Sequence, residues 1–341
     1  MHYKVVSIDL AKNVFQVCGL DHHHQIKHNK KISRKNLLDA LRQLPADLYV
    51  MEACYSSNPW ARAIEALGYQ GKVKLIPPHQ VKPFLIGNKN DANDAVAIAE
   101  AALRPKARFV AIKTLEQQDL QSLDRIRNRL VKHHTAVINQ LRGLLSEYGI
   151  AAPKGPHNLK ANIPFILENP SNALTPTARQ FVNSLYLECQ QLSERMVTVE
   201  RDTNALVQCH PDYQRLQSIR GIGPVTATAL IASINDANQF KNGRAMAAWL
   251  GLAPSQRSSG DNTVMGGMSK RGNAHLRQLL IHGARTVMNW CTNKTDKLSL
   301  WINNLLKRMH PCKAIVAVAN KIARIAWAVL AKKTVYSPDL V

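Results

Sequence analysis

Short apolar runs separated by helical patterns make up the first 110 residues of the chain. Four runs have the length and the β-branched content of strands, at 4–10, 14–20, 48–53 and 72–76. Apolar residues recur at helical spacing between them, at about 34–44 and 58–68. The first two runs are joined by three residues, which indicates a hairpin, and the later runs alternate with helices. The pattern predicts a mixed α/β sheet covered by helices over residues 1–110.

Long heptad patterns replace the short runs after residue 115. One row of apolar residues recurs every seven positions at Leu123, Leu130, Val137 and Leu144. A second row begins after Thr175-Pro176, a favourable N-cap followed by proline, and consists of Ala178, Leu185, Leu192, Val199 and Leu206. Two such helices predict an antiparallel coiled coil or a dimer seam over residues 111–205, joined by a loop at 152–175. We therefore expect a homo-oligomer, either a dimer or a tetramer.

Shorter helical patterns return in the last part of the chain. After His210-Pro211 they are separated by glycine-marked loops at 221–223, 242–243, 251–260 and 266–272. This change of periodicity predicts a third, mainly α-helical domain over residues 206–341.

Positive charge is concentrated in that third domain. The chain has 45 Lys and Arg against 23 Asp and Glu, a net charge of +22. Residues 206–341 hold 18 of the basic side chains and only 5 of the acidic ones. Because these cations are interleaved with apolar helical residues, they predict a folded basic surface for a polyanion, with nucleic acid as the leading candidate.

The sequence favours a cytoplasmic protein associated with the nucleoid. Its six cysteines form no CxxC pair and have no histidines at zinc-site spacing, which is typical of reduced cytosolic thiols. No stretch of 18 uncharged apolar residues occurs, so we expect no membrane partner. The histidine run at 22–24 falls in a polar turn without a fourth ligand, and we interpret it as solvated.

Four carboxylates in the first domain form a candidate metal site. Asp9 and Glu52 each stand within an apolar strand pattern, VVSIDLAKN and LYVMEACYSS, while Asp91 and Asp94 are spaced i, i+3 at the start of a helix. Carboxylate oxygens are hard ligands suited to Mg²⁺ or Mn²⁺, which organise phosphodiester displacement. In the alternative interpretation, Asp9 caps a turn, Glu52 pairs with a lysine, and the two helical aspartates form a solvated first turn.

Two glycine-rich segments of the third domain are candidate nucleic-acid contacts. Arg220, Gly221 and Gly223 lie in a Gly-Ile-Gly turn between apolar helices, as in a helix–hairpin–helix, where glycine lets backbone amides approach a phosphate. An ordinary helix connection is the alternative. Further on, Lys270 and Arg271 precede another helix. They complete the set of predicted phosphate contacts.

A serine in the same region is a candidate nucleophile. Ser258 and Ser259 precede Gly260 in a segment without periodic apolar residues, which predicts a loop. A serine in such a loop, surrounded by cations, can attack a phosphate and hold a covalent intermediate. An ordinary surface loop has the same composition.

Taken together, these segments resemble the DEDD transposases of the insertion-sequence 110/1111 class over nearly the whole chain. The motifs that carry the resemblance are SIDLAK, VMEACYS, NKNDANDA, LQSIRGIGPVTA, AAWLGLAP followed by SSG, and MSKRGNAHLRQLL. The resemblance implies a RuvC-like, ribonuclease H-like fold for the first domain, in which Asp9, Glu52, Asp91 and Asp94 bind Mg²⁺. It also implies that Ser259, next to Ser258, is the nucleophile that cuts and rejoins donor and target DNA. The family further implies guidance by a structured non-coding bridge RNA.

Two other functions are compatible with the same residues. A RuvC-like junction-resolving nuclease would use the tetrad with a metal-activated water and no serine. A non-catalytic nucleic-acid-binding protein would use the basic surface alone, and its carboxylates would be structural.

Overall fold

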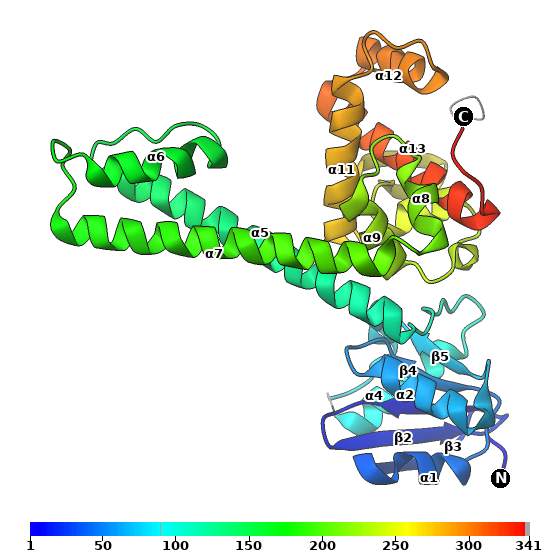
Figure 1. Ribbon diagram of the computed structural model, residues 1–341. Helices are drawn as coiled ribbons and strands as arrows, with labels where there is room; N and C mark the ends of the chain where they lie inside the picture. Colours follow the sequence, from blue (N-terminus) through cyan, green and yellow to red (C-terminus); the bar gives the residue numbers. More distant parts are fainter. Residues whose placement is uncertain (89, 338–341) are drawn as a thin grey trace. The chain divides into compact units, whose positions relative to one another are not determined.

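A computed structural model describes residues 1–88 and 90–337 of the chain (Figure 1). Lys89 of the NKNDANDA motif and residues 338–341 of the expected third domain lie outside the described residues. The chain divides into two compact units, Met1–Thr114 and Leu115–Val341. An α/β sheet in the first unit and a mostly helical second unit confirm the coarse fold that the sequence predicts.

The first unit is built on a five-stranded mixed sheet in the order β3-β2-β1-β4-β5. Strand β1 pairs antiparallel with β2 and parallel with β4, and β5 continues the parallel half. The strands are β1 (Val5–Asp9), β2 (Val14–Leu20), β3 (Ile26–Ser33), β4 (Tyr49–Glu52) and β5 (Val73–Ile76). The helices of this unit are η1 (Arg34–Asn36), α1 (Leu37–Arg42), α2 (Ser57–Ile64), η2 (Glu65–Tyr69), α3 (Pro78–Val81), η3 (Lys82–Phe84) and α4 (Asp91–Ala102).

Helices cover both faces of this sheet. On one face, Val6 and Ile8 of β1 pack in a cluster with residues of α1 and α2. On the other face, Val5 and Val50 pack against the alanine-rich side of α4. Since side chains alternate along a strand, Asp9 points to the α4 face.

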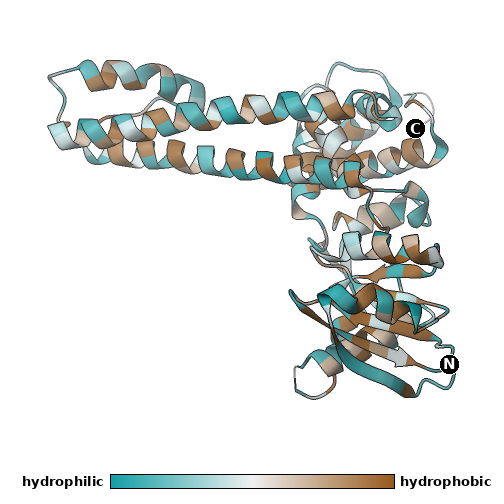
Figure 2. Ribbon diagram, turned by 60° about the horizontal axis from the view of Figure 1, so that its bottom comes forward, coloured by the Kyte–Doolittle hydropathy of each residue, from teal (hydrophilic) through white to brown (hydrophobic). Residues whose placement is uncertain are grey.

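Two long helices and one short helix open the second unit, α5 (Leu115–Glu147), α6 (Pro156–Glu168) and α7 (Pro176–Val207). Helices α5 and α7 run antiparallel and pack along one another (Figure 1). Figure 2 shows apolar and polar residues alternating along both. Leu130, Val137 and Leu192 from the heptad rows are buried there, whereas Leu206 is 56% exposed. The segment 152–175 was expected to be a loop, but it contains helix α6. Leu159 and Ile163 of this helix pack in the same apolar cluster.

Six further helices pack around one apolar cluster, which includes Leu216, Leu230, Leu280 and Ile322. They are α8 (Pro211–Gln217), α9 (Pro224–Ser233), α10 (Gly243–Trp249), α11 (Ala274–Asn289), α12 (Lys297–Arg308) and α13 (Pro311–Lys332), with a short η4 (Ala237–Gln239). Helix α13 is long and apolar enough to cross a membrane by length and composition. Its apolar residues belong to this cluster, so it is the core helix of the unit.

The segment expected to be a loop around the two serines is a β-hairpin. Strands β6 (Pro254–Ser259) and β7 (Asn262–Met268) pair antiparallel, with Ser259 opposite Asn262. Gly260 begins the two-residue turn with a φ of 57°, which glycine adopts without steric cost. Nearly all of the hairpin is exposed, so it has no buried face to give the sequence an alternating apolar pattern.

Candidate active site

Parallel pairing of β1 and β4 brings two of the predicted carboxylates side by side. Ile8 is opposite Met51 in the register, so Asp9 and Glu52 are the adjacent last residues of neighbouring strands. Val50 packs toward α4 and Met51 toward α1 and α2, which places Glu52 on the α4 face with Asp9.

The first turn of α4 supplies the other two carboxylates. Asn90 caps the helix, because its side chain accepts a 2.8 Å hydrogen bond from the backbone N–H of Asn93. Ser7, fully buried, donates a 2.6 Å hydrogen bond from Oγ to the backbone carbonyl of Ala95. This bond ties α4 to β1 two residues before Asp9 and next to Asp94. The strand and the helix therefore hold their carboxylates at the same edge of the sheet.

Burial and the repulsion between neighbouring carboxylates raise the pKa values of Asp9 and Glu52. The pKa of Asp9 is raised to about 6, mainly by burial and then by the negative charges of Asp94, Asp91 and Glu52, in that order. Burial and Asp94 also raise the pKa of Glu52. Asp91 lies at the margin, since its carboxylate is 55% exposed and forms a 3.1 Å ion pair with Lys31 of β3. All three neighbouring carboxylates therefore act on Asp9, and Asp91 is in addition paired with Lys31.

The donor set fits a hard divalent cation in chemistry and charge. Four carboxylates would supply the oxygen ligands that Mg²⁺ and Mn²⁺ prefer, and a cation would offset the repulsion that raises the pKa of Asp9. Among residues 1–88 and 90–337, no three His, Cys, Asp or Glu side chains form a closed group ready to hold a metal. The backbone therefore brings the carboxylates together, while their side-chain oxygens do not converge on one point.

We predict that Asp9→Asn stabilises the metal-free protein at pH 7.5 by about 1–2 kcal/mol. The raised pKa means that folding favours the protonated carboxyl, so its contribution to stability is present at low pH and lost as the pH rises through about 6. The full shift corresponds to roughly 3 kcal/mol, which partial exposure of Asp9 reduces. Thermal unfolding in EDTA should show a higher Tm for the variant at pH 7.5 and little difference near pH 4. An equal Tm at both pH values, as we expect for the exposed control Asp39→Asn, would contradict it.

The candidate nucleophile lies in the second unit. Ser259 is exposed at the end of β6, and Ser258 precedes it. Ser258 Oγ accepts a 2.7 Å hydrogen bond from Gln256 Nε2 and lies 3.4 Å from Thr263 Oγ1. Neighbouring residues of a strand point to opposite faces. The hydroxyl of Ser259 is therefore on the face of the hairpin opposite to these partners.

The structure gives Arg220 and Gly221 internal contacts. Arg220 Nη1 donates to Asp296 Oδ2 at 2.7 Å and to Ser299 Oγ at 3.2 Å. Gly221 has a φ of 89°, and a Cβ there would meet the Gly283 carbonyl of α11 at 3.0 Å. The turn is therefore pressed against α11, whereas Gly223 has open space before α9. These contacts favour the helix-connection interpretation for Arg220 and Gly221.

Lys270 and Arg271 lie at the base of the hairpin. Lys270 has a φ of 55°, and its backbone N–H donates to the carbonyl of Gly251 at 3.2 Å. Arg277 of α11 donates from Nη1 to the carbonyls of Leu250 and Arg271. Backbone contacts thus fix where the hairpin leaves the helical core, and Arg271 is exposed there.

Sequence reasoning missed a basic cavity in the second unit. Arg244, Lys321, Arg324 and Lys332, from α10 and α13, line a cavity of about 540 Å³. No acidic side chain is among its described lining residues. Burial and the neighbouring Arg324 lower the pKa of Lys321. Arg244 is far in the chain from the other three, which all lie on α13, so only the packing of α10 against α13 reveals the complete cluster.

Comparison with known proteins shows the family. A model described as a transposase matches residues 6–150, and one described as the transposase IS116/IS110/IS902 family matches residues 213–299. The chain is 44% identical over 333 residues to the transposase for insertion sequence element IS1111A of Coxiella burnetii, which covers 98% of this chain and 91% of the relative.

Two other relatives span nearly the whole chain. A probable family 20 transposase of Pseudomonas aeruginosa is 44% identical over 339 residues, 99% of this chain and 100% of its own length. The transposase for insertion sequence element IS1328 of Yersinia enterocolitica is 37% identical and covers 98% of each chain. Because the likeness extends over both units, the chain belongs to the IS116/IS110/IS902 family of transposases and is an insertion-sequence transposase.

Proposed function

We propose that this transposase cuts and rejoins donor and target DNA through a serine nucleophile and a divalent metal site. The carboxylates Asp9, Glu52, Asp91 and Asp94 would hold Mg²⁺ or Mn²⁺ in a RuvC-like, ribonuclease H-like domain. The observation that carries the proposal is that strand and helix place their carboxylates at one sheet edge, where burial and then the neighbouring negative charges raise the pKa of Asp9 to about 6. Groups perturbed in this way by burial and like charge are typical of active sites.

Each part has a separate chemical task. A bound metal supplies positive charge for a phosphate whose charge increases in the transition state. Ser259 Oγ forms an ester bond to the phosphorus as one bridging P–O bond breaks, and the hydroxyl proton goes to the departing deoxyribose oxygen. The phosphoserine ester keeps the bond energy, so the reverse attack by a DNA hydroxyl can rejoin strands without another energy source.

Positive charge in the second unit supports DNA binding. The cavity lined by Arg244, Lys321, Arg324 and Lys332 has a concentration of cations that a phosphate backbone can neutralise. Lys270, Arg271 and Gly223 remain proposed phosphate contacts. Arg220 and Gly221 belong to the proposed set with less support, because Asp296 and α11 already engage them.

The resemblance extends the proposal to an RNA partner, to the oligomeric state and to the cellular location. A non-coding bridge RNA from the element would pair with donor and target DNA, so that base pairing reads the sequence. The antiparallel α5 and α7 would form the seam of a dimer or tetramer, for which the exposed Leu206 and Val197 provide apolar surface. The protein would act in the cytoplasm, on the nucleoid.

A strand-joining reaction with purified components tests the proposal. Plasmids that carry the element ends and a target are incubated with the protein and with RNA transcribed from the element's flanking region. We expect joined DNA junctions in Mg²⁺ or Mn²⁺ and none in EDTA, because uncompensated carboxylates cannot stabilise the phosphate. Junctions formed in EDTA would contradict the metal site. Cut ends without any junction would instead favour the water-using nuclease.

A further inference from the structure

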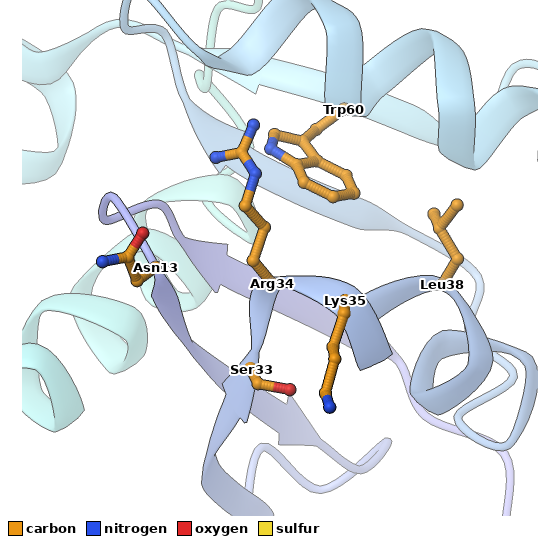
Figure 3. A pocket seen from close by; sticks show the side chains of 6 residues that line it. All are labelled: Asn13, Ser33, Arg34, Lys35, Leu38 and Trp60. Carbon is orange, nitrogen blue, oxygen red and sulfur yellow. The ribbon is translucent and has the colours of Figure 1, made fainter.

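A second concave site lies in the first unit, away from the carboxylates. Six residues, Asn13, Ser33, Arg34, Lys35, Leu38 and Trp60, line a cavity of about 600 Å³ (Figure 3). Trp60 and Leu38 bound one part of it with apolar surface, while Arg34, Lys35 and Ser33 are polar (Figure 3). A cavity of this size accommodates one nucleotide.

The aromatic and cationic groups of this cavity are held in place by the sheet. The guanidinium carbon of Arg34 lies 5.2 Å from the centre of the Trp60 ring and 5.9 Å from that of Phe15. Phe15 packs edge-on against Trp60 with ring centres 5.1 Å apart. Arg34 Nη1 also donates a 3.1 Å hydrogen bond to the carbonyl of Lys12. Arg34 thus lies over one face of the Trp60 indole, and the Phe15 ring packs roughly perpendicular to the same indole.

Two polar atoms of the lining residues have no hydrogen-bond partner among the described residues. They are Ser33 Oγ and Trp60 Nε1, and both are buried. Unsatisfied buried groups are uncommon in folded proteins and call for a functional or structural reason. Ser33 and Trp60 both line this cavity. No ion pair is formed by Arg34 or Lys35 within the described part of the chain, so their charges are available to an anion.

The cavity opens at the end of the sheet that carries the carboxylates. In the register, Asp9 is opposite Gln16, Gln16 is opposite Lys31, and Ser33 follows two residues further along β3. Strand spacing and rise place the Cα of Ser33 roughly 12 Å from that of Asp9, a few nucleotides at most along a bound strand. Lys31, two residues before Ser33 on β3, forms the ion pair with Asp91. Trp60 and Leu38 pack with the α1 and α2 cluster, so the cavity lies on the face of the sheet opposite to the carboxylates, and a nucleic-acid strand that contacts both crosses this end of the sheet.

We propose that this cavity binds a nucleotide of the DNA strand held at the carboxylates, a few steps from the phosphate that reacts. The base packs on the indole of Trp60 and on Leu38, and the adjoining phosphate lies between Arg34 and Lys35. Aromatic stacking with flanking cations is the usual way to hold a single strand without sequence preference. The inference rests on the proposed DNA chemistry, but its binding test does not require recombination.

Binding of a fluorescein-labelled oligothymidylate to the full chain, measured by fluorescence anisotropy, tests the cavity. We expect Trp60→Leu to weaken binding by roughly tenfold or more, and Trp60→Phe to retain most of it, because the phenyl ring still stacks. The double variant Arg34→Gln and Lys35→Gln should also lower the slope of log affinity against log salt by about 2. Both cations are exposed, so this variant keeps its fold even where Trp60→Leu does not.

The matched control is Lys72→Gln. Lys72 is an exposed cation just before β5, at the opposite end of the parallel strands, and its loss should change affinity less than twofold. Equal effects of Lys72→Gln and the Arg34 and Lys35 double variant would overturn the proposal.

Photo-crosslinking locates the contact in the DNA. With iodouracil moved one position at a time across the cleavage site, the crosslinked peptide should contain Trp60 at one or two positions only. Crosslinks that avoid this peptide, or that appear with the bridge RNA in place of DNA, would also overturn the proposal. Normal junction formation alongside such a result would show that the cavity assignment fails while the proposed function stands.

Discussion

Replacing Ser259 by alanine should abolish the covalent protein–DNA complex and reduce strand joining by at least about a thousandfold. Loss of a nucleophile removes the step that stores the phosphodiester bond energy, and losses of this size are typical for such residues. DNA binding should stay within about twofold, because one hydroxyl contributes little beside so many cations. The measurement is denaturing gel electrophoresis of protein trapped on labelled DNA.

Ser258→Ala is the matched control, since it removes the same atom one residue away. Ser258 shares its face of the hairpin with Gln256 and Thr263, so its hydroxyl points away from that of Ser259. We expect a milder loss of joining and a normal adduct. An adduct that persists in Ser259→Ala but disappears in Ser258→Ala would transfer the role to Ser258. Cleavage without an adduct in the unmodified protein would favour the junction-resolving nuclease.

Removal of one central carboxylate should have a comparable effect on activity. Asp9→Ala, Glu52→Ala and Asp94→Ala should each lower junction formation by roughly 10²–10³-fold or more, because a metal site that loses a ligand no longer stabilises transition-state charge. Asp91→Asn should cost less, since Asp91 is half exposed and already paired with Lys31. Junction formation is measured across a Mn²⁺ titration, which should partly rescue Asp91→Asn.

Glu100→Gln is the control for this series. It removes the same charge from the same helix, α4, at the end remote from Asn90 and the first turn. Activity should stay within about twofold. A loss equal to that of Asp94→Ala would mean that the net charge of α4, and not a metal site at its start, controls the reaction. Full activity of Asp9→Ala would contradict the metal site.

The strongly periodic elements could be predicted from the sequence, and the polar ones could not. The buried strands β1, β2, β4 and β5 coincide with the four apolar runs, and α5 and α7 with the heptad patterns. Strand β3, IKHNKKIS, was missed because an edge strand faces solvent and has few apolar residues to alternate. The hairpin β6–β7 was missed for the same reason, although Gly260-Asp261 is a recognisable two-residue turn.

The site shows a similar division between local and long-range information. Asp9 and Glu52 were identifiable because a carboxylate in an apolar strand is unusual, and Asp91 and Asp94 because they start a helix. The raised pKa values of Asp9 and Glu52 depend on the pairing of β1 with β4 and on the Ser7 bond to α4, which no local pattern contains. Arg220 illustrates the limit, because its partner Asp296 is 76 residues away.

The hairpin that carries Ser259 has little folding stability of its own. Isolated two-stranded hairpins are marginal in water, and nearly all of this one is exposed, with Val264 and Met265 64% and 58% accessible. Its base is fixed by backbone contacts between Gly251 and Lys270, whereas a Cβ placed on Gly260 in its turn would meet no described atom within 4 Å. On the proposed mechanism, the nucleophile would become well ordered only when DNA or a partner subunit covers the hairpin. Cleavage by the free protein would then be rare, because without DNA or a partner subunit the hairpin would seldom hold Ser259 in a position to react.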